Sequence, residues 1–155
     1  MKKRPRLYAS ADSRLAAAGS SAPAGVLAGS AHPPVLDAGA LARLAELDPR
    51  GHNRLLDRVM RAFQSSVARL RPQADAARTT NDRSALQLVV HTLKSSSASI
   101  GALQLSQLCA QIESTLRSKD AADLDGADWP AQLHALDAEL DTVLAAIDNF
   151  LQERA

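Results

Sequence analysis

The chain has 155 residues, enough for one domain with a hydrophobic core and a tail, and 46% of them are hydrophobic. Ala and Leu dominate this fraction, aromatic residues make up only 3%, and Val and Ile are too few to fill a sheet, so the composition indicates an all-α protein. The net charge of +1 gives no field that would favour nucleic acid as a partner. The single cysteine, Cys109, excludes an internal disulfide and argues against a structural zinc site.

The first part of the chain, residues 1–34, is rich in Ala, Ser, Gly and Pro and has few large apolar side chains, which predicts a disordered tail. Its basic start is followed by Asp12 and Arg14 instead of an apolar stretch, so we expect no signal peptide. No run in the sequence approaches the roughly 18 apolar residues of a membrane span. We therefore expect a soluble, cytoplasmic protein without contact to a membrane.

Residues 35–152 form the predicted folded domain, in which apolar residues recur at helical spacing. A short helix over residues 36–47 ends at Pro49 and Gly51. A second helix begins near His52, and Pro72 is expected to bend or interrupt it. It ends near Arg78.

Three further helices complete this domain. The third follows the polar turn at residues 79–82, which offers an N-cap, and Gly101 separates it from the fourth. The fourth ends near Lys119, and the fifth begins at Trp129 and Pro130 and continues to Leu151. Four long amphipathic helices with short connections predict an up-down-up-down four-helix bundle, with the short N-terminal helix capping one end.

One histidine of the third helix is predicted to face away from the core. At about 100° per residue, the apolar residues of this helix cluster on one side and His91 falls roughly opposite them. The residues projected around His91 are mostly small or apolar: Ser84, Gln87, Leu88, Lys94, Ser95 and Ala98. A partner can approach such a patch closely. An exposed imidazole is a nucleophile, and Lys94 one turn away can offset the charge of an arriving phosphoryl group.

The run from His91 to Ala102, which reads HTLKSSSASIGA, together with Leu105, Leu108, Cys109, Ile112 and Glu113, resembles the signature of the histidine-containing phosphotransfer (HPt) family. The resemblance covers residues 36–151. It implies that His91 accepts a phosphoryl group from the aspartate of one receiver domain and passes it to another. The protein would then be a stoichiometric phosphocarrier of a two-component phosphorelay, without an ATP site and without enzymatic activity of its own.

The resemblance also implies the surroundings of the histidine. Lys94 would lie beside the phosphohistidine, while the position of Glu113 holds Glu or Gln in the family and that of Arg117 is sometimes basic, so both are expected to orient the site or the partner. We expect Gln87 and Ser95 to support the site as well. The residues expected to contact the partner are Ser84, Leu88 and Ala98. Many family members have glycine where this chain has Ser95, which affects clearance for the partner more than the function.

The partners implied are receiver domains of response regulators and a hybrid sensor kinase, and the protein is expected to be a monomer. No cofactor or metal is expected on this chain, because the receiver would bring the Mg²⁺. The other histidines, His32, His52 and His134, form no ligand cluster by their spacing. Cys109 lies on an apolar stripe and is expected to be a buried structural thiol.

Three alternatives remain open from the residues. A kinase dimerisation domain would need a nucleotide-binding region, and the chain has no glycine-rich phosphate loop. An adaptor bundle that binds receivers without transferring phosphate is not excluded, although the pairing of His91 with Lys94 on an exposed face argues against it. An enzyme with a hidden metal or nucleotide site finds no supporting group of residues.

Overall fold

The structure, a computed structural model, describes residues 34–118 and 128–155. These residues form one short and four long helices, and no strand occurs among them. The helices are α2 (Ala38–Glu46), α3 (Leu55–Thr79), α4 (Arg83–Ser99), α5 (Leu103–Arg117) and α6 (Asp128–Glu153). The disordered tail predicted for residues 1–34 lies outside the described residues except for Pro34 and stays a prediction.

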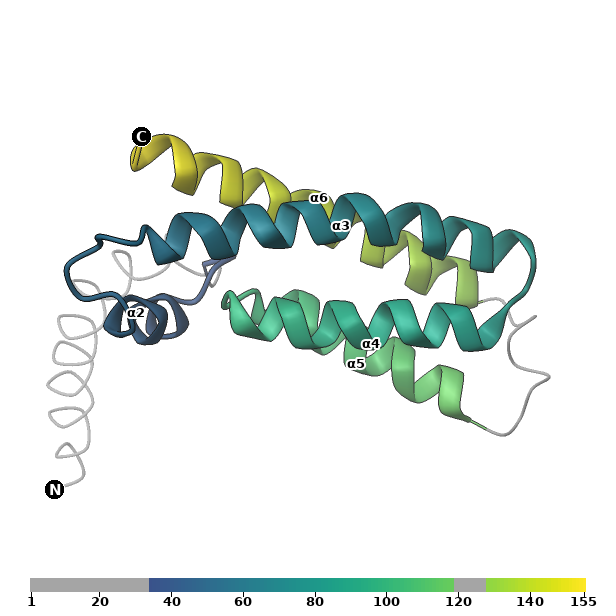
Figure 1. Cartoon of the computed structure of the whole chain (residues 1–155). Helices are drawn as coiled ribbons and strands as arrows, with labels where there is room; N and C mark the ends of the chain where they lie inside the picture. Colours follow the sequence, from purple (N-terminus) through teal and green to yellow (C-terminus); the bar gives the residue numbers. More distant parts are fainter. Residues whose placement is uncertain (1–33, 119–127) are drawn as a thin grey trace, which may run out of the picture. The chain divides into compact units, whose positions relative to one another are not determined.

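The four long helices pack as a bundle with alternating directions (Figure 1). Helix α3 contacts α4 and α6, and α5 contacts the same two helices, so each long helix has two neighbours. The core consists almost entirely of aliphatic side chains from all four, with Met60, Leu105, Ile112 and Ile147 fully buried. The all-α class and the four-helix bundle predicted from the periodicity are confirmed, and the short helix α2 packs against α3.

Helix α4, which carries the histidine of interest, starts where the sequence predicts. Asp82 is its N-cap, and the carboxylate accepts a hydrogen bond from the backbone N–H of Ala85 at 3.0 Å. Asn81 precedes it with a positive φ of 54°, which closes the tight turn after α3. Since Leu86, Val89, Leu93, Ser97 and Ile100 are all buried, the predicted inner face of this helix is confirmed.

Two expectations about helix boundaries differ from the structure. Helix α3 begins at Leu55, three residues after His52, because the Asp48 carboxylate accepts hydrogen bonds from the N–H groups of Asn53 and Leu55 and holds the preceding turn. Of the two outcomes expected at Pro72, the interruption does not occur, because α3 is one helix up to Thr79, and the bend stays a prediction. Proline has no N–H for the carbonyl four residues before it, and because Pro72 is exposed, water can reach that carbonyl. Arg71 also holds this part of α3 to α6 through a contact of 2.6 Å with Asp141.

Gly101 joins α4 to α5 and brings α2 onto the end of the bundle. Its φ is +81°, and a Cβ at this position would lie 3.0 Å from both the Cβ of Ala40 and the backbone nitrogen of Asp37. Its carbonyl accepts a hydrogen bond of 2.8 Å from the N–H of Asp37. The close approach of the two backbones therefore needs a residue without a side chain, as the predicted role at the helix junction implies.

We expect Gly101→Ala to lower the free energy of unfolding by about 2–4 kcal/mol, because it combines backbone strain with a clash against α2. Gly51→Ala is the matched control, since Gly51 also has a positive φ of 67° but a Cβ there meets nothing within 4 Å. In this control the free energy of unfolding should fall only by the cost of the backbone strain, about 1–2 kcal/mol. Urea unfolding of both variants measures the difference, and equal losses would contradict the proposed contact.

Candidate functional site

The site is built on the outer faces of α4 and α5, where His91 projects from the middle of α4. Its side chain is 54% exposed, as the helical projection predicts. The ring nitrogen Nδ1 lies 3.1 Å from Oε1 of Glu113, which reaches across from α5. Within residues 34–118 and 128–155, no hydrogen-bond partner occurs for the other ring nitrogen, Nε2. One nitrogen of the imidazole is thus held and the other is free.

Glu113 is the centre of a charged cluster. Its side chain is only 3% exposed, and it contacts three other residues: His91, Lys94 and Arg117. Oε2 lies 2.6 Å from Nζ of Lys94, and Oε1 also pairs with Arg117, one turn further along α5. The contact with Lys94 is the largest influence that lowers the pKa of Glu113. The hydrogen bond with His91 and the charge of Arg117 lower it further, while burial opposes them. Glu113 is therefore a carboxylate at neutral pH.

Lys94 is less exposed than the projection onto the outer face of α4 suggests. Its side chain is 31% exposed because it leans across to Glu113 instead of extending into solvent. The backbone of Lys94 is also fixed to α5, because its carbonyl accepts a hydrogen bond of 3.0 Å from the hydroxyl of Ser106. The lysine is therefore positioned beside His91 by contacts to the neighbouring helix.

A shallow pocket of about 250 Å³ opens beside the imidazole. The residues that line it are Ser84, Gln87, Leu88, His91, Glu113 and Arg117. The structure thus brings together at this pocket three of the α4 residues that the projection places near His91 and the two α5 residues implied by the family resemblance. Leu88 is 68% exposed, which leaves an apolar side chain in the pocket beside the imidazole.

Two other predicted residues lie on the exposed side of α4 without lining this pocket. Ser95 is exposed, and its hydroxyl donates a hydrogen bond of 3.3 Å to the carbonyl of His91. Ala98 is exposed one turn further on. Both leave a flat surface of small side chains beside the imidazole, so a partner meets no bulky group there.

Cys109 lies behind the site and takes no part in it. The thiol is buried, and burial, reinforced by the nearby charge of Glu113, raises its pKa to about 12. Such a thiol stays protonated and unreactive at neutral pH. The prediction of a buried structural cysteine is confirmed.

A second, larger pocket lies at the end of the bundle and not at the histidine. It measures about 290 Å³ and is lined mainly by the connection from α2 to α3 and by Arg154 of α6. Arg154 and Arg54 both pair with the buried Asp57, at 2.8 and 2.6 Å, and the hydrogen bond from Arg154 is the main cause of its lowered pKa. The sequence alone did not indicate this cluster, because its two ends lie 97 positions apart. Arg154 thereby ties the end of α6 to the start of α3, whereas Arg54 contacts Asp57 within the first turn of α3.

In the part of the chain that the structure describes, no group of three His, Cys, Asp or Glu side chains comes together to hold a metal ion. None of the helices described is both long and apolar enough to cross a membrane.

An exposed nucleophilic imidazole on a four-helix bundle, paired with a buried carboxylate and a nearby lysine, is the arrangement of a protein that carries a group between partners. The family model of the Hpt domain matches residues 58–146, and the chain belongs to this family. The protein is therefore a histidine phosphotransfer protein of phosphorelays. Members of this family are phosphocarriers that interact with receiver domains of response regulators and with kinases.

The bundle is similar to the crystal structure of histidine-containing phosphotransfer protein B (HptB) from Pseudomonas aeruginosa PAO1. The TM-score is 0.62 and the sequences are 28% identical over 79% of this chain and 98% of that chain. No curated protein matches the sequence.

Proposed function

We propose that Nε2 of His91 is the atom that takes up the phosphoryl group. The hydrogen bond between Nδ1 and Glu113 carries this proposal. A carboxylate can only accept a hydrogen bond, so Nδ1 must carry the proton in the neutral imidazole. The lone pair is then on Nε2, the nitrogen that is free of contacts. Glu113 therefore selects the tautomer whose nucleophilic nitrogen faces the partner.

The transfer needs no proton to move. The lone pair of Nε2 attacks the phosphorus of an aspartyl phosphate, the new N–P bond forms, and the P–O bond to the aspartate breaks, releasing a carboxylate on the receiver. The ring, which keeps its proton on Nδ1, becomes a cation, and the buried charge of Glu113 stabilises it at 3.1 Å. The reverse step, onto the aspartate of a second receiver, uses the same atoms.

Lys94 and Arg117 supply positive charge at the site. Both contact Glu113 in this structure, and both are close enough to the imidazole to turn toward the oxygens of a phosphoryl group on Nε2. No cofactor is needed on this chain, since Mg²⁺ would be held by the receiver. We assign supporting roles to Gln87 and Ser95, and contact with the partner to Ser84, Leu88 and Ala98.

The partners we propose are receiver domains, one of them in a hybrid sensor kinase, with this chain acting as a monomer in the cytoplasm. Its role is that of a stoichiometric carrier without turnover of its own. The exposed, mostly small surface around His91 supports docking of a folded domain there.

The experiment that tests this function uses purified receiver domains of the host, each charged with radiolabelled acetyl phosphate. Incubation with the full chain should move the label to one site that is labile in acid and stable in alkali, as a phosphorus–nitrogen bond is. Receivers that bind this chain without any transfer of label would instead identify an adaptor.

Lys94→Ala should slow transfer about tenfold, because the variant lacks one of the two cations beside the phosphoryl group. The free energy of unfolding should fall by about 1–3 kcal/mol, because Oε2 of the buried Glu113 loses the contact with Lys94 while His91 and Arg117 still contact Oε1. Lys94→Arg, which keeps the charge, is the control and should recover much of the rate. Stopped-flow or rapid-quench transfer gives the rates, and an unchanged rate in Lys94→Ala would remove this residue from the site.

A further inference from the structure

On helix α3, the arginines that pair with acidic residues of α6 and the arginines without an ion-pair partner lie at different positions around the helix. On the side of α6, Arg71 lies 2.6 Å from Asp141, Arg78 pairs with Asp137, and Gln64 donates a hydrogen bond to Asp148. Three other arginines of α3, Arg58, Arg61 and Arg69, are exposed, and none has an ion-pair partner among the described residues. The charge of these three side chains is therefore not paired within the bundle.

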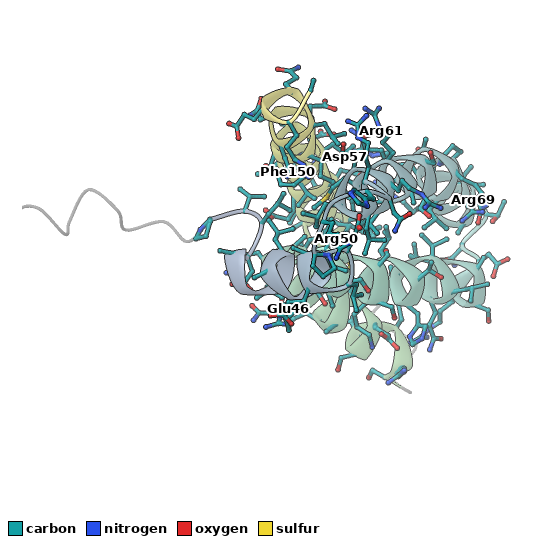
Figure 2. The ribbon with its side chains drawn as sticks, turned by 60° about the vertical axis from the view of Figure 1, so that its left-hand side comes forward. Glu46, Arg50, Asp57, Arg61, Arg69 and Phe150 are labelled. Carbon is teal, nitrogen blue, oxygen red and sulfur yellow. The ribbon has the colours of Figure 1, made fainter. Side chains whose placement is uncertain are left out.

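Arg58 and Arg69 lie on the part of the exposed surface of α3 that is nearer to α4, whereas Arg61, about 80° around the helix from Arg71, lies nearer to α6. At about 100° per residue, Arg69 and Arg58 are roughly 160° and 140° around the helix from Arg71, which marks the side of α6. Helix α3 packs between α6 and α4, so the opposite flank borders α4. Figure 2 shows Arg69 extending outward from α3, away from α6.

Arg69 is also level with His91 along the bundle. The two helices are antiparallel and joined by a tight turn (Figure 1). Both residues lie about 15 Å along their helix axes from this turn at a rise of about 1.5 Å per residue. Neighbouring helix axes are about 8–10 Å apart, so the helix that carries Arg69 is one helix spacing from the helix that carries His91. Arg58 lies about three turns further toward the end of α4.

The surface between His91 and these arginines carries no acidic side chain. By the same periodicity, the flank of α4 that turns toward α3 presents Leu88, Thr92, Ser95 and Ser99. The acidic residues of α3, Asp57 and Asp75, lie on its other side, and each contacts an arginine. The candidate site therefore continues, without an intervening negative charge, onto a basic edge formed by Arg58 and Arg69.

We propose that Arg58 and Arg69 form the basic edge of the docking surface for a receiver domain whose surface carries acidic side chains beside its phosphorylation pocket. This inference rests on the proposed function, because it extends the partner surface around His91. A typical interface covers about 800 Å² on each partner, which accommodates Arg69 together with His91 and places Arg58 at the rim. Charges at a rim act mainly on the rate of encounter and on the choice between partners.

The test uses the double variant Arg58→Glu, Arg69→Glu and the receiver that labels the wild-type chain fastest in the transfer assay above. At low ionic strength, the second-order rate of transfer should fall about tenfold or more, while the rate at saturating receiver stays unchanged. The difference should shrink as salt is added, because the screening length falls from about 30 Å at 0.01 M to about 3 Å at 1 M.

The matched control is Arg43→Glu, Arg50→Glu, which changes the net charge equally. Both arginines are exposed and have no ion-pair partner among the described residues, and Arg50 lies at the end of the bundle, apart from Arg69 (Figure 2). This control should transfer nearly as fast as the wild type. An equal loss in both double variants, or no loss in the first, overturns the docking edge.

Binding measured by calorimetry with His91→Gln chains separates the docking edge from the proposed function. If no receiver labels the wild type but one of them binds the chain, and the α3 double variant weakens that binding, the edge holds and the transfer function fails. If label moves normally in the α3 double variant, the edge fails and the transfer function holds. The absence of both binding and label contradicts both.

Discussion

His91→Gln is expected to abolish uptake of the phosphoryl group from every charged receiver. Glutamine has no lone pair on nitrogen that can attack phosphorus, because the amide nitrogen is conjugated with its carbonyl. Its N–H group can still donate to the Glu113 carboxylate, so the charged cluster keeps a partner in this position. The measurement is the label retained by the chain after separation from the receiver, which should drop to background.

The same variant should remain folded. His91 is 54% exposed and contributes no side chain to the core, so the free energy of unfolding should change by about 1 kcal/mol or less. Thermal unfolding and binding to the receiver provide the controls. Label that persists at the wild-type level in a folded His91→Gln chain would place the phosphoryl acceptor elsewhere, with His134 and His52 as the next residues to replace.

The helices and the exposure of His91 could be predicted because periodicity reports directly on which face of a helix is buried. The stripe of α4 and the polar turn before it determine where His91 points, and both depend on neighbours in the sequence. The effect of Pro72 could not be predicted in this way. Arg71, the residue before the proline, donates hydrogen bonds to the Asp137 carbonyl and the Asp141 carboxylate of α6, and these contacts depend on the tertiary arrangement.

Periodicity does not predict how deeply the charged residues of the site are buried or which partners they have. The resemblance implied Glu113 as an orienting residue, but its burial and its three simultaneous partners follow from the packing of α5 against α4. A signal was present in the sequence, since Glu113 follows Cys109 by one turn and so borders an apolar stripe. An acidic residue in such a place needs partners from another helix, and Lys94 and His91 are the ones that α4 offers.

The unpaired arginines on α3 show a different limit of prediction from the sequence. Composition gives a net charge of +1 and hides the separation of charge between helices. Helix α6 carries the acids that pair with Arg71 and Arg78, and only knowledge of which helices are neighbours shows that Arg58, Arg61 and Arg69 stay without an acidic partner among the described residues. Helix order around the bundle therefore determines which charges remain available to a partner.

Replacement of Glu113 tests whether the carboxylate selects the tautomer or only stabilises the ring. Glu113→Gln keeps an oxygen that can accept a hydrogen bond from Nδ1–H, so Nε2 stays nucleophilic. Because the negative charge is lost, transfer should slow about tenfold. Glu113→Ala removes both features and should slow transfer about a hundredfold. Equal rates in the two variants would show that the hydrogen bond to Nδ1 has no role, and wild-type rates in both would remove Glu113 from the site.

The same variants make a prediction about acid stability. Lys94, His91 and Arg117 hold the pKa of Glu113 below its ordinary value of 4.5 in the folded chain. A carboxyl group whose pKa is lower in the folded than in the unfolded chain stabilises the fold above the unfolded value, and this contribution disappears as the pH falls through the folded value. The wild type should therefore lose stability more steeply than Glu113→Gln below about pH 4.5. Asp57, whose pKa is also lowered, is present in both proteins, so urea unfolding as a function of pH isolates Glu113 in the difference between them. Parallel pH profiles would mean that the carboxylate gains nothing from its three partners in the folded chain.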